Sequence, residues 1–146
     1  MKNVFITAAG TYLPNKAVSN DEMETYLGFV NGKKSKAKKR VLEQNGIHTR
    51  YYAIDQKQKT THSKSELAKL AIESALEKSN LRGKEIQFLS TGTTQGDLPI
   101  PGFASMVHAG LDFEKCELAS FQSVCASSMM ALKNAYPTII PSMDRF

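Results

Sequence analysis

Short hydrophobic runs alternate along the chain with longer segments of helical periodicity. The runs that favour strands are Val4–Ala8, Ile86–Thr91 and Leu118–Phe121. The strand at Val4–Ala8 is expected to be buried. Helices are expected over residues 19–27, 63–80, 103–111 and 126–136. Because strands alternate with helices, the pattern predicts βαβ units and therefore an α/β fold with a mainly parallel sheet.

Local signals place several helix ends. Ser19 with Glu22, and Ser63 with Glu66, form two sequence patterns typical of a capping box, in which each side chain bonds a free amide at the helix start. Gly46 is placed to end a helix that follows the basic segment. The helix that begins after Ser63 has a broad apolar face, so we expect it to pack against the sheet.

The end of the chain departs from this pattern. Pro137 and Pro141 are expected to interrupt the last helix, because proline inside a helix removes a hydrogen bond and clashes with the preceding turn. Residues 137–146 are therefore atypical of a helix beneath a sheet. A truncated gene, a frameshift or a fragment would explain this tail.

Composition limits the classes of protein to which the chain can belong. With 146 residues, 41% of them hydrophobic and 23% charged, the chain suits one soluble domain spanning residues 1–146. It has no run that could span a membrane and no secretory signal, so we expect a cytoplasmic protein without membrane partners. Two cysteines and no Cys/His cluster at zinc spacing predict free thiols and no metal.

The net charge of +5 is concentrated in Lys33–Arg40. Such a run can attract nucleic acid, an anionic cofactor or an acidic protein, or it can be a solvated helix face. Nucleic-acid binding is disfavoured, because the run lacks interleaved aromatic residues and no recognition motif appears.

The most informative stretch runs from Leu118 to Leu132, where a strand, a tight turn, Cys125 and a helix are expected in that order. A cysteine at a helix N-terminus lies near the positive end of the helix dipole, which favours the reactive thiolate. The small residues Ala126, Ser127 and Ser128 would leave room for an acyl group beside the sulfur. The alternative is a buried structural cysteine. Cys116 lacks any such setting.

Several segments, taken together, resemble the ketoacyl-acyl-carrier-protein synthase III family of the thiolase superfamily. The spacing from Pro101 to Cys125 also fits that family. The segments that carry the resemblance are Ile6–Pro14, Val18–Glu22, Asn45–Tyr51 with its Gly-Ile-x-x-Arg pattern, and Thr91–Pro101.

The resemblance implies a fold and a chemistry. The chain would be a thiolase-like N-terminal domain, one half of a duplicated fold, with a mainly parallel central sheet and helices packed on it. Cys125 would accept an acyl group from acyl-coenzyme A, for decarboxylative condensation with malonyl-acyl carrier protein in fatty-acid or polyketide synthesis. No cofactor would be permanently bound. A hydroxymethylglutaryl-coenzyme A synthase, a chalcone-synthase-like enzyme and a non-catalytic dimerising half-domain remain alternatives.

The resemblance also implies a His and an Asn that join the cysteine from the second half of a longer chain. The histidines here, His48, His62 and His108, all precede Cys125 and none matches that position. The chain has no Trp to stack on the adenine of coenzyme A, although Arg40 could meet its phosphates. We therefore expect partial catalysis at most, and a partner that is either a second copy or a complementary C-terminal half.

Overall fold

The structure is a computed structural model that describes residues 3–142, with side chains described up to residue 138. The chain folds as two compact units. The smaller unit is Leu13–Ser63, and the larger unit combines the residues up to Tyr12 with those from Lys64 onward.

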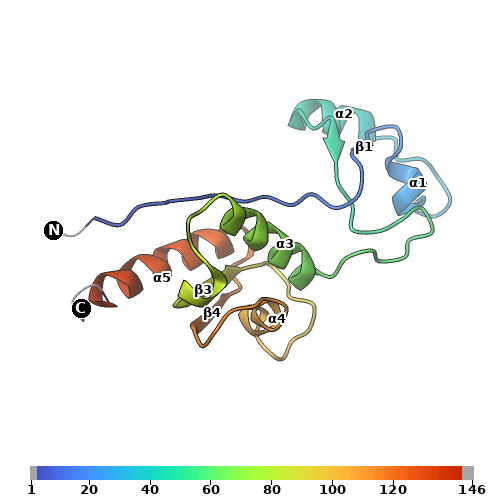
Figure 1. Ribbon diagram of the computed structural model, residues 1–146. Helices are drawn as coiled ribbons and strands as arrows, with labels where there is room; N and C mark the ends of the chain where they lie inside the picture. Colours follow the sequence, from blue (N-terminus) through green and yellow to red (C-terminus); the bar gives the residue numbers. More distant parts are fainter. Residues whose placement is uncertain (1–2, 143–146) are drawn as a thin grey trace. The chain divides into compact units, whose positions relative to one another are not determined.

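The larger unit is built on two parallel strands, β3 (Phe88–Gly92) and β4 (Glu117–Phe121), paired in register from Phe88 with Glu117 to Gly92 with Phe121 (Figure 1). Its α-helices and 3₁₀ turns, in chain order, are α3 (Lys64–Glu77), η1 (Gly83–Glu85), α4 (Phe103–Ala109), η2 (Val124–Ala126) and α5 (Ser127–Ser142). The order strand, helix, parallel strand, helix confirms the α/β pattern predicted from the sequence.

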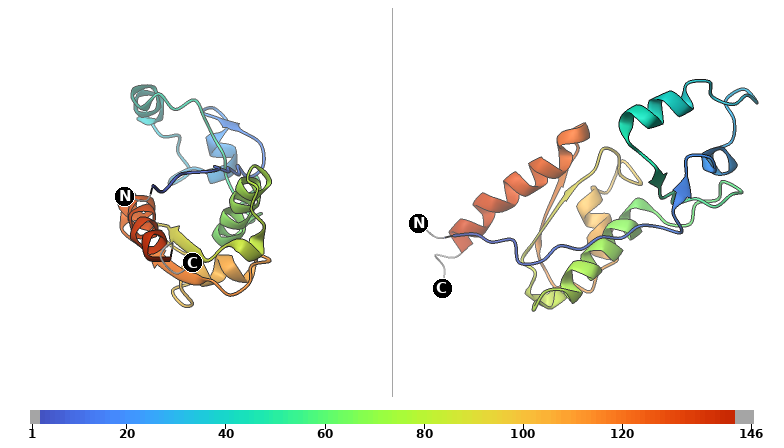
Figure 2. Two further views of the ribbon diagram at one scale, coloured as in Figure 1. Left: turned by 60° about the vertical axis from the view of Figure 1, so that its left-hand side comes forward. Right: turned by 90° about the horizontal axis from the view of Figure 1, so that it is seen from above.

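Helices cover both faces of this strand pair, as the two views in Figure 2 show. Alternate side chains of a strand point to opposite faces. Leu89 packs with Phe103 and Val107 of α4 on one face, and these three residues form the core cluster. On the other face the Ser90 hydroxyl donates to the carbonyl oxygen of Ala131 in α5 at 3.0 Å. The predicted sheet with helices packed on it is thus confirmed.

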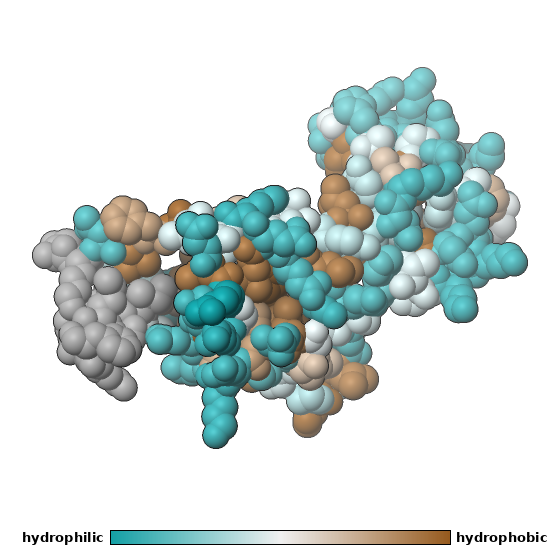
Figure 3. Space-filling model, viewed as in Figure 1, coloured by the Kyte–Doolittle hydropathy of each residue, from teal (hydrophilic) through white to brown (hydrophobic). Residues whose placement is uncertain are grey.

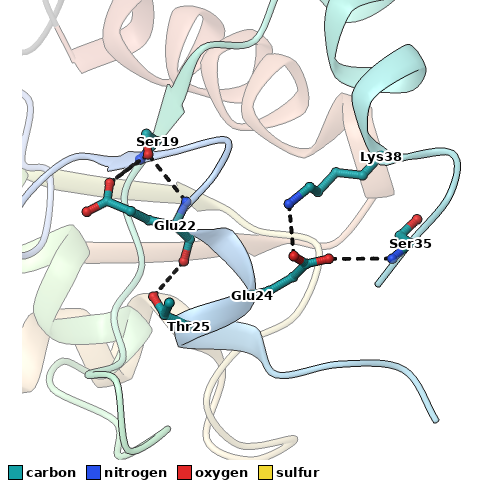
Figure 4. A network of polar contacts seen from close by, with 6 residues as sticks. All are labelled: Ser19, Glu22, Glu24, Thr25, Ser35 and Lys38. Atoms are coloured by element: carbon teal, nitrogen blue, oxygen red, sulfur yellow. Dashed lines mark hydrogen bonds and ion pairs between the residues drawn. The ribbon is translucent and has the colours of Figure 1, made fainter. Parts of the chain in front are cut away.

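The smaller unit contains β1 (Val18–Ser19) paired antiparallel with β2 (Thr49–Arg50), and two helices, α1 (Met23–Leu27) and α2 (Lys38–Asn45). The predicted capping box before α1 is present. The Glu22 carboxylate accepts hydrogen bonds from the amide and the hydroxyl of Ser19 at 3.0 and 2.7 Å (Figure 4). Gly46 ends α2 with a left-handed backbone (φ 64°), as its position predicted.

The strand predicted over Val4–Ala8 does not form. The segment has no strand assignment, and Phe5 and Ile6 are 74% and 82% exposed rather than buried. The reason is that an apolar run becomes a strand only when a neighbouring strand accepts its backbone hydrogen bonds, and within residues 3–142 none does. The backbone at Gly10 nevertheless packs closely against α3, since a β-carbon there would lie 2.3 Å from the Ala71 carbonyl oxygen.

The predicted interruption of the last helix at Pro137 and Pro141 is also wrong, because α5 continues to Ser142. The fixed φ of proline lies near the helical value, so the helix can continue through each proline, although each one costs a hydrogen bond and crowds the preceding turn. Thr138 adds a local bond, its hydroxyl donating to the Asn134 carbonyl oxygen at 2.9 Å. The remainder of the tail, residues 143–146, lies outside the described residues.

Candidate functional site

Cys125 lies in the turn that leads from the parallel strand pair into α5. β4 ends at Phe121, the 3₁₀ turn η2 spans Val124–Ala126, and α5 begins at Ser127. The sequence therefore placed the thiol correctly, next to the N-terminus of a helix. Cys125 is exposed, which contradicts the alternative of a buried structural cysteine.

Ser127 holds this turn in place. It is 3% exposed, and its hydroxyl accepts a hydrogen bond from the Ser123 amide at 2.9 Å. The same oxygen lies 2.8 Å from the Val124 carbonyl oxygen and 3.1 Å from the Thr93 carbonyl oxygen, and these two acceptors share its single hydrogen. One buried hydroxyl thus ties the residues just before Cys125 to the loop that follows β3.

The backbone just before the thiol is strained. Val124 has a φ of 49°, in the left-handed region that β-branched residues rarely adopt. Its side chain is 66% exposed, so packing does not hold it there. Hydrogen bonds do, because the Val124 carbonyl accepts from the Thr94 hydroxyl at 3.3 Å as well as from Ser127. Strain kept by surrounding contacts is a frequent feature of functional turns.

The last residue of β3 lets α5 approach the sheet. A β-carbon at Gly92 would lie 2.5 Å from the backbone carbonyl carbon and oxygen of Ser127 and 2.7 Å from the Ser128 nitrogen. Glycine is therefore required for the first turn of α5 to rest on β3 beside Cys125.

The role of Ser127 was missed from the sequence. Its small size predicts room for an acyl group, whereas its side chain is buried inside the turn. Ala126 and Ser128 are exposed, so they do leave space near the thiol. The sequence signal for this contact is a hydroxyl two residues after the cysteine, combined with a glycine at the end of the preceding core strand.

The other thiol is structural. Cys116 is half-buried and packs against the core cluster of Leu89, Phe103 and Val107. Burial raises the pKa of the Cys116 thiol, which disfavours the thiolate. This agrees with the absence of any reactive setting in its sequence.

The histidines are engaged in other local contacts. His108, half-buried in α4, places Nε2 3.2 Å from the Glu114 carbonyl oxygen and its ring edge-on to Phe113. His108 therefore has a packing role in α4. His62 is half-buried beside Thr61, and His48 is exposed.

Arg40, the residue proposed for coenzyme A, is exposed on α2 in the smaller unit. Between residues 3 and 142, no group of His, Cys, Asp or Glu side chains is arranged to hold a metal ion. Over the same range, no helix is both long and apolar enough to cross a membrane.

Comparison with known proteins identifies relatives of this chain. Over 139 residues, 95% of the chain, it is 30% identical to beta-ketoacyl-[acyl-carrier-protein] synthase III of Dinoroseobacter shibae, of which it covers 39%. The enzyme of the same name from Cereibacter sphaeroides is 30% identical over 130 residues. The chain is homologous to part of beta-ketoacyl-[acyl-carrier-protein] synthase III. The resemblance found in the sequence is thereby confirmed, although no protein-family model matches the chain.

Solved structures establish the fold. The synthase III of Aquifex aeolicus superposes with a TM-score of 0.73 at 22% identity, covering 92% of this chain and 40% of its own. AbyA1, a tetronic acid condensing enzyme, superposes with a TM-score of 0.77 at 23% identity, with 91% and 40% covered. The chain therefore has the thiolase-like α/β fold of the matching part of these two structures. The chain spans about two fifths of the length of the synthase III relatives that it matches.

Proposed function

We propose that this chain is the acyl-accepting part of a condensing enzyme of fatty-acid or related polyketide synthesis, with Cys125 as the nucleophile. The observation that supports the proposal is the exposed thiol of Cys125, in a turn fixed by the buried Ser127 hydroxyl at the entrance to α5. Residues that are held rigidly at the end of core elements are suited to present a nucleophile to a substrate.

In the first step the Cys125 thiolate attacks the thioester carbonyl of acyl-coenzyme A. The bond from sulfur to the acyl carbon forms, the bond to coenzyme A breaks, and the coenzyme A thiolate leaves and takes a proton from solvent. Malonyl-acyl carrier protein then loses carbon dioxide, and its carbanion attacks the enzyme thioester, which releases the Cys125 thiolate. For the second step, the resemblance implies a His and an Asn that follow the cysteine in the relatives.

The first step is therefore the one to test on this chain. Incubation with acetyl-, butyryl- and octanoyl-coenzyme A, followed by intact-mass measurement, is expected to show one acyl adduct. Cys125→Ser should abolish the adduct, whereas the matched variant Cys116→Ser should retain it. A folded protein that acquires no adduct from any of the donors, or one that acquires it at Cys116, would contradict the proposal.

Acyl-coenzyme A and acyl carrier protein are the partners that this function requires. Arg40 and the neighbouring lysines of α2 are proposed to meet the phosphates of coenzyme A, since a positive segment attracts an anionic donor. Arg40→Gln is expected to slow acylation by acetyl-coenzyme A but not by the neutral donor acetyl-N-acetylcysteamine. Equal slowing with both donors would refute this assignment.

We further propose that the protein acts in the cytoplasm, either as a homodimer or with a complementary C-terminal half. Apolar side chains reach the surface of the larger unit, as the brown areas of Figure 3 show. Met129, Leu132 and Tyr136 of α5 are 65%, 54% and 53% exposed. Exposed apolar groups of this extent favour association. A dimer that never takes up an acyl group would favour the non-catalytic half-domain instead. Light scattering after gel filtration that gives a stable monomer would contradict the homodimer.

A further inference from the structure

The smaller unit contains a cavity whose apolar walls take no part in the proposed chemistry at Cys125. It has a volume of about 370 Å³ and lies between α1, α2 and the loop that joins them. This volume lies within the usual range for small-molecule sites. Its apolar walls are formed by Met23, Leu27, Phe29, Val30, Val41 and Leu42.

The negative charge of the acidic residue in the wall is balanced by a lysine. The Glu24 carboxylate accepts from the Lys38 ammonium at 3.0 Å and from the Ser35 amide at 3.4 Å (Figure 4). The hydrogen bond from Lys38 lowers the pKa of Glu24, so this carboxylate remains ionised near neutral pH. The pair joins α1 to the start of α2 and closes one side of the cavity.

A second lysine of the wall is available to a ligand. Lys33 is exposed and, within the described part of the chain, makes no ion pair. A tight turn through Asn31 and Gly32, both with positive φ, brings Lys33 opposite Val30, and the Lys33 amide donates to the Val30 carbonyl at 3.1 Å. The turn therefore places a cation beside an apolar wall residue that is itself 80% exposed.

The basic segment beside the cavity carries positive charge only. Six of the eight residues from Lys33 to Arg40 are Lys or Arg, and none is acidic. An apolar cavity with a free ammonium at its rim suits a ligand with an aliphatic body and one anionic end. Sugars and other highly polar ligands do not fit, because the walls offer few hydrogen-bonding groups.

We propose that this cavity binds a free medium- or long-chain fatty carboxylate, with the chain against the apolar walls and the carboxylate on Lys33. The chain leaves water by entering a concave site, which favours a single fatty anion over the surface of a membrane. This site is independent of Cys125 and does not rest on its acylation.

Calorimetric titration of the Cys125→Ser protein with dodecanoate, below its aggregation concentration, tests the proposal. We expect one site, tighter binding of dodecanoate than of octanoate, and no binding of the equally long cation dodecyltrimethylammonium. Lys33→Gln should weaken binding about 5- to 10-fold, since one charge-assisted contact is lost. Lys36→Gln, in the same basic run but outside the cavity wall, is the matched control and should leave the affinity within about twofold, as expected for a screened charge.

Phe29→Ser removes wall area from a residue that is 51% exposed, so the fold should survive, as circular dichroism will check. It should also weaken dodecanoate binding. Equal binding of the cationic surfactant, or an equal loss in Lys36→Gln, would overturn the proposal. Displacement of dodecanoate by coenzyme A would show a nucleotide site instead, and binding only to anionic phospholipid vesicles would show a membrane surface; either result refutes the fatty-anion site.

Discussion

The backbone of Gly92, at the end of β3, lies directly against the backbone of Ser127, at the start of α5. A β-carbon on Gly92 would stand 2.5 Å from the Ser127 carbonyl oxygen. Since the Ser127 hydroxyl also bonds the residues on both sides of this contact, β3, the turn and α5 form one rigid corner. Cys125 is carried by that corner.

Gly92→Ala is therefore expected to push α5 away from the sheet and displace the thiol. Overpacking of this kind typically costs about 1–3 kcal/mol of unfolding free energy. Chemical denaturation should reveal this loss, and the rate of Cys125 acylation should fall with it. Gly110→Ala is the matched control, because the nearest atoms to its β-carbon lie at 3.4 Å, on the flexible Lys69 side chain. Equal stability of the two variants would contradict the close contact.

Ser127→Ala should loosen the turn without introducing a clash. It removes the acceptor of the Ser123 amide, and losing an ordinary intramolecular hydrogen bond costs about 0.5–1.5 kcal/mol. We also expect a changed ratio between the alkylation rates of Cys125 and Cys116 by iodoacetamide, measured as a function of pH. Ser128→Ala, on the neighbouring exposed hydroxyl, serves as the control. A general loss of stability with an unaltered alkylation ratio would show that Ser127 does not position the thiol.

Local sequence signals predicted the parts of the fold that depend on neighbours in the chain. The Ser19 and Glu22 pair before α1 and the glycine after α2 work within one helical turn, so their residue types are sufficient to identify them. The placement of Cys125 was predictable for the same reason, because strand, turn and helix follow one another directly.

Contacts between residues that are distant in the sequence could not be predicted in the same way. The apolar run Val4–Ala8 has the composition of a buried strand, but composition does not supply the second strand that would accept its hydrogen bonds. The contact of Ser127 with Thr93 joins residues 34 positions apart, and the carboxylate of Asp97 reaches back 33 positions to α3. Such contacts depend on the three-dimensional arrangement, which periodicity does not encode.

Val124→Gly should relieve the strain before the thiol. A non-glycine residue in the left-handed region costs about 1–3 kcal/mol, and the side chain of Val124 is largely exposed, so little packing is lost. We expect a gain of about 1 kcal/mol in unfolding free energy, because the greater freedom of glycine in the unfolded chain offsets part of the relief. Ala126→Gly, which lies outside the positive-φ residues, should instead lower stability. A loss in both variants would argue against strain at Val124.

Asp97 should make stability depend on pH. Its carboxylate accepts from the amides of Lys64 and Ser65, both at 2.8 Å, and so caps the start of α3. Burial raises the pKa of this carboxyl, but the hydrogen bonds from Ser65 and Lys64 outweigh burial and leave the pKa below its ordinary value. The folded state therefore binds the proton less readily than the unfolded chain.

The contribution of this cap to stability is complete above about pH 4 and is lost as pH falls through the lower folded pKa. Denaturant titrations between pH 2 and 7 should show this acid loss. Asp97→Asn should reduce it and lower stability at pH 7 by about 0.3–1 kcal/mol, because the negative charge near the helix N-terminus is lost. An acid dependence that is the same in both proteins would show that this carboxylate does not cap α3.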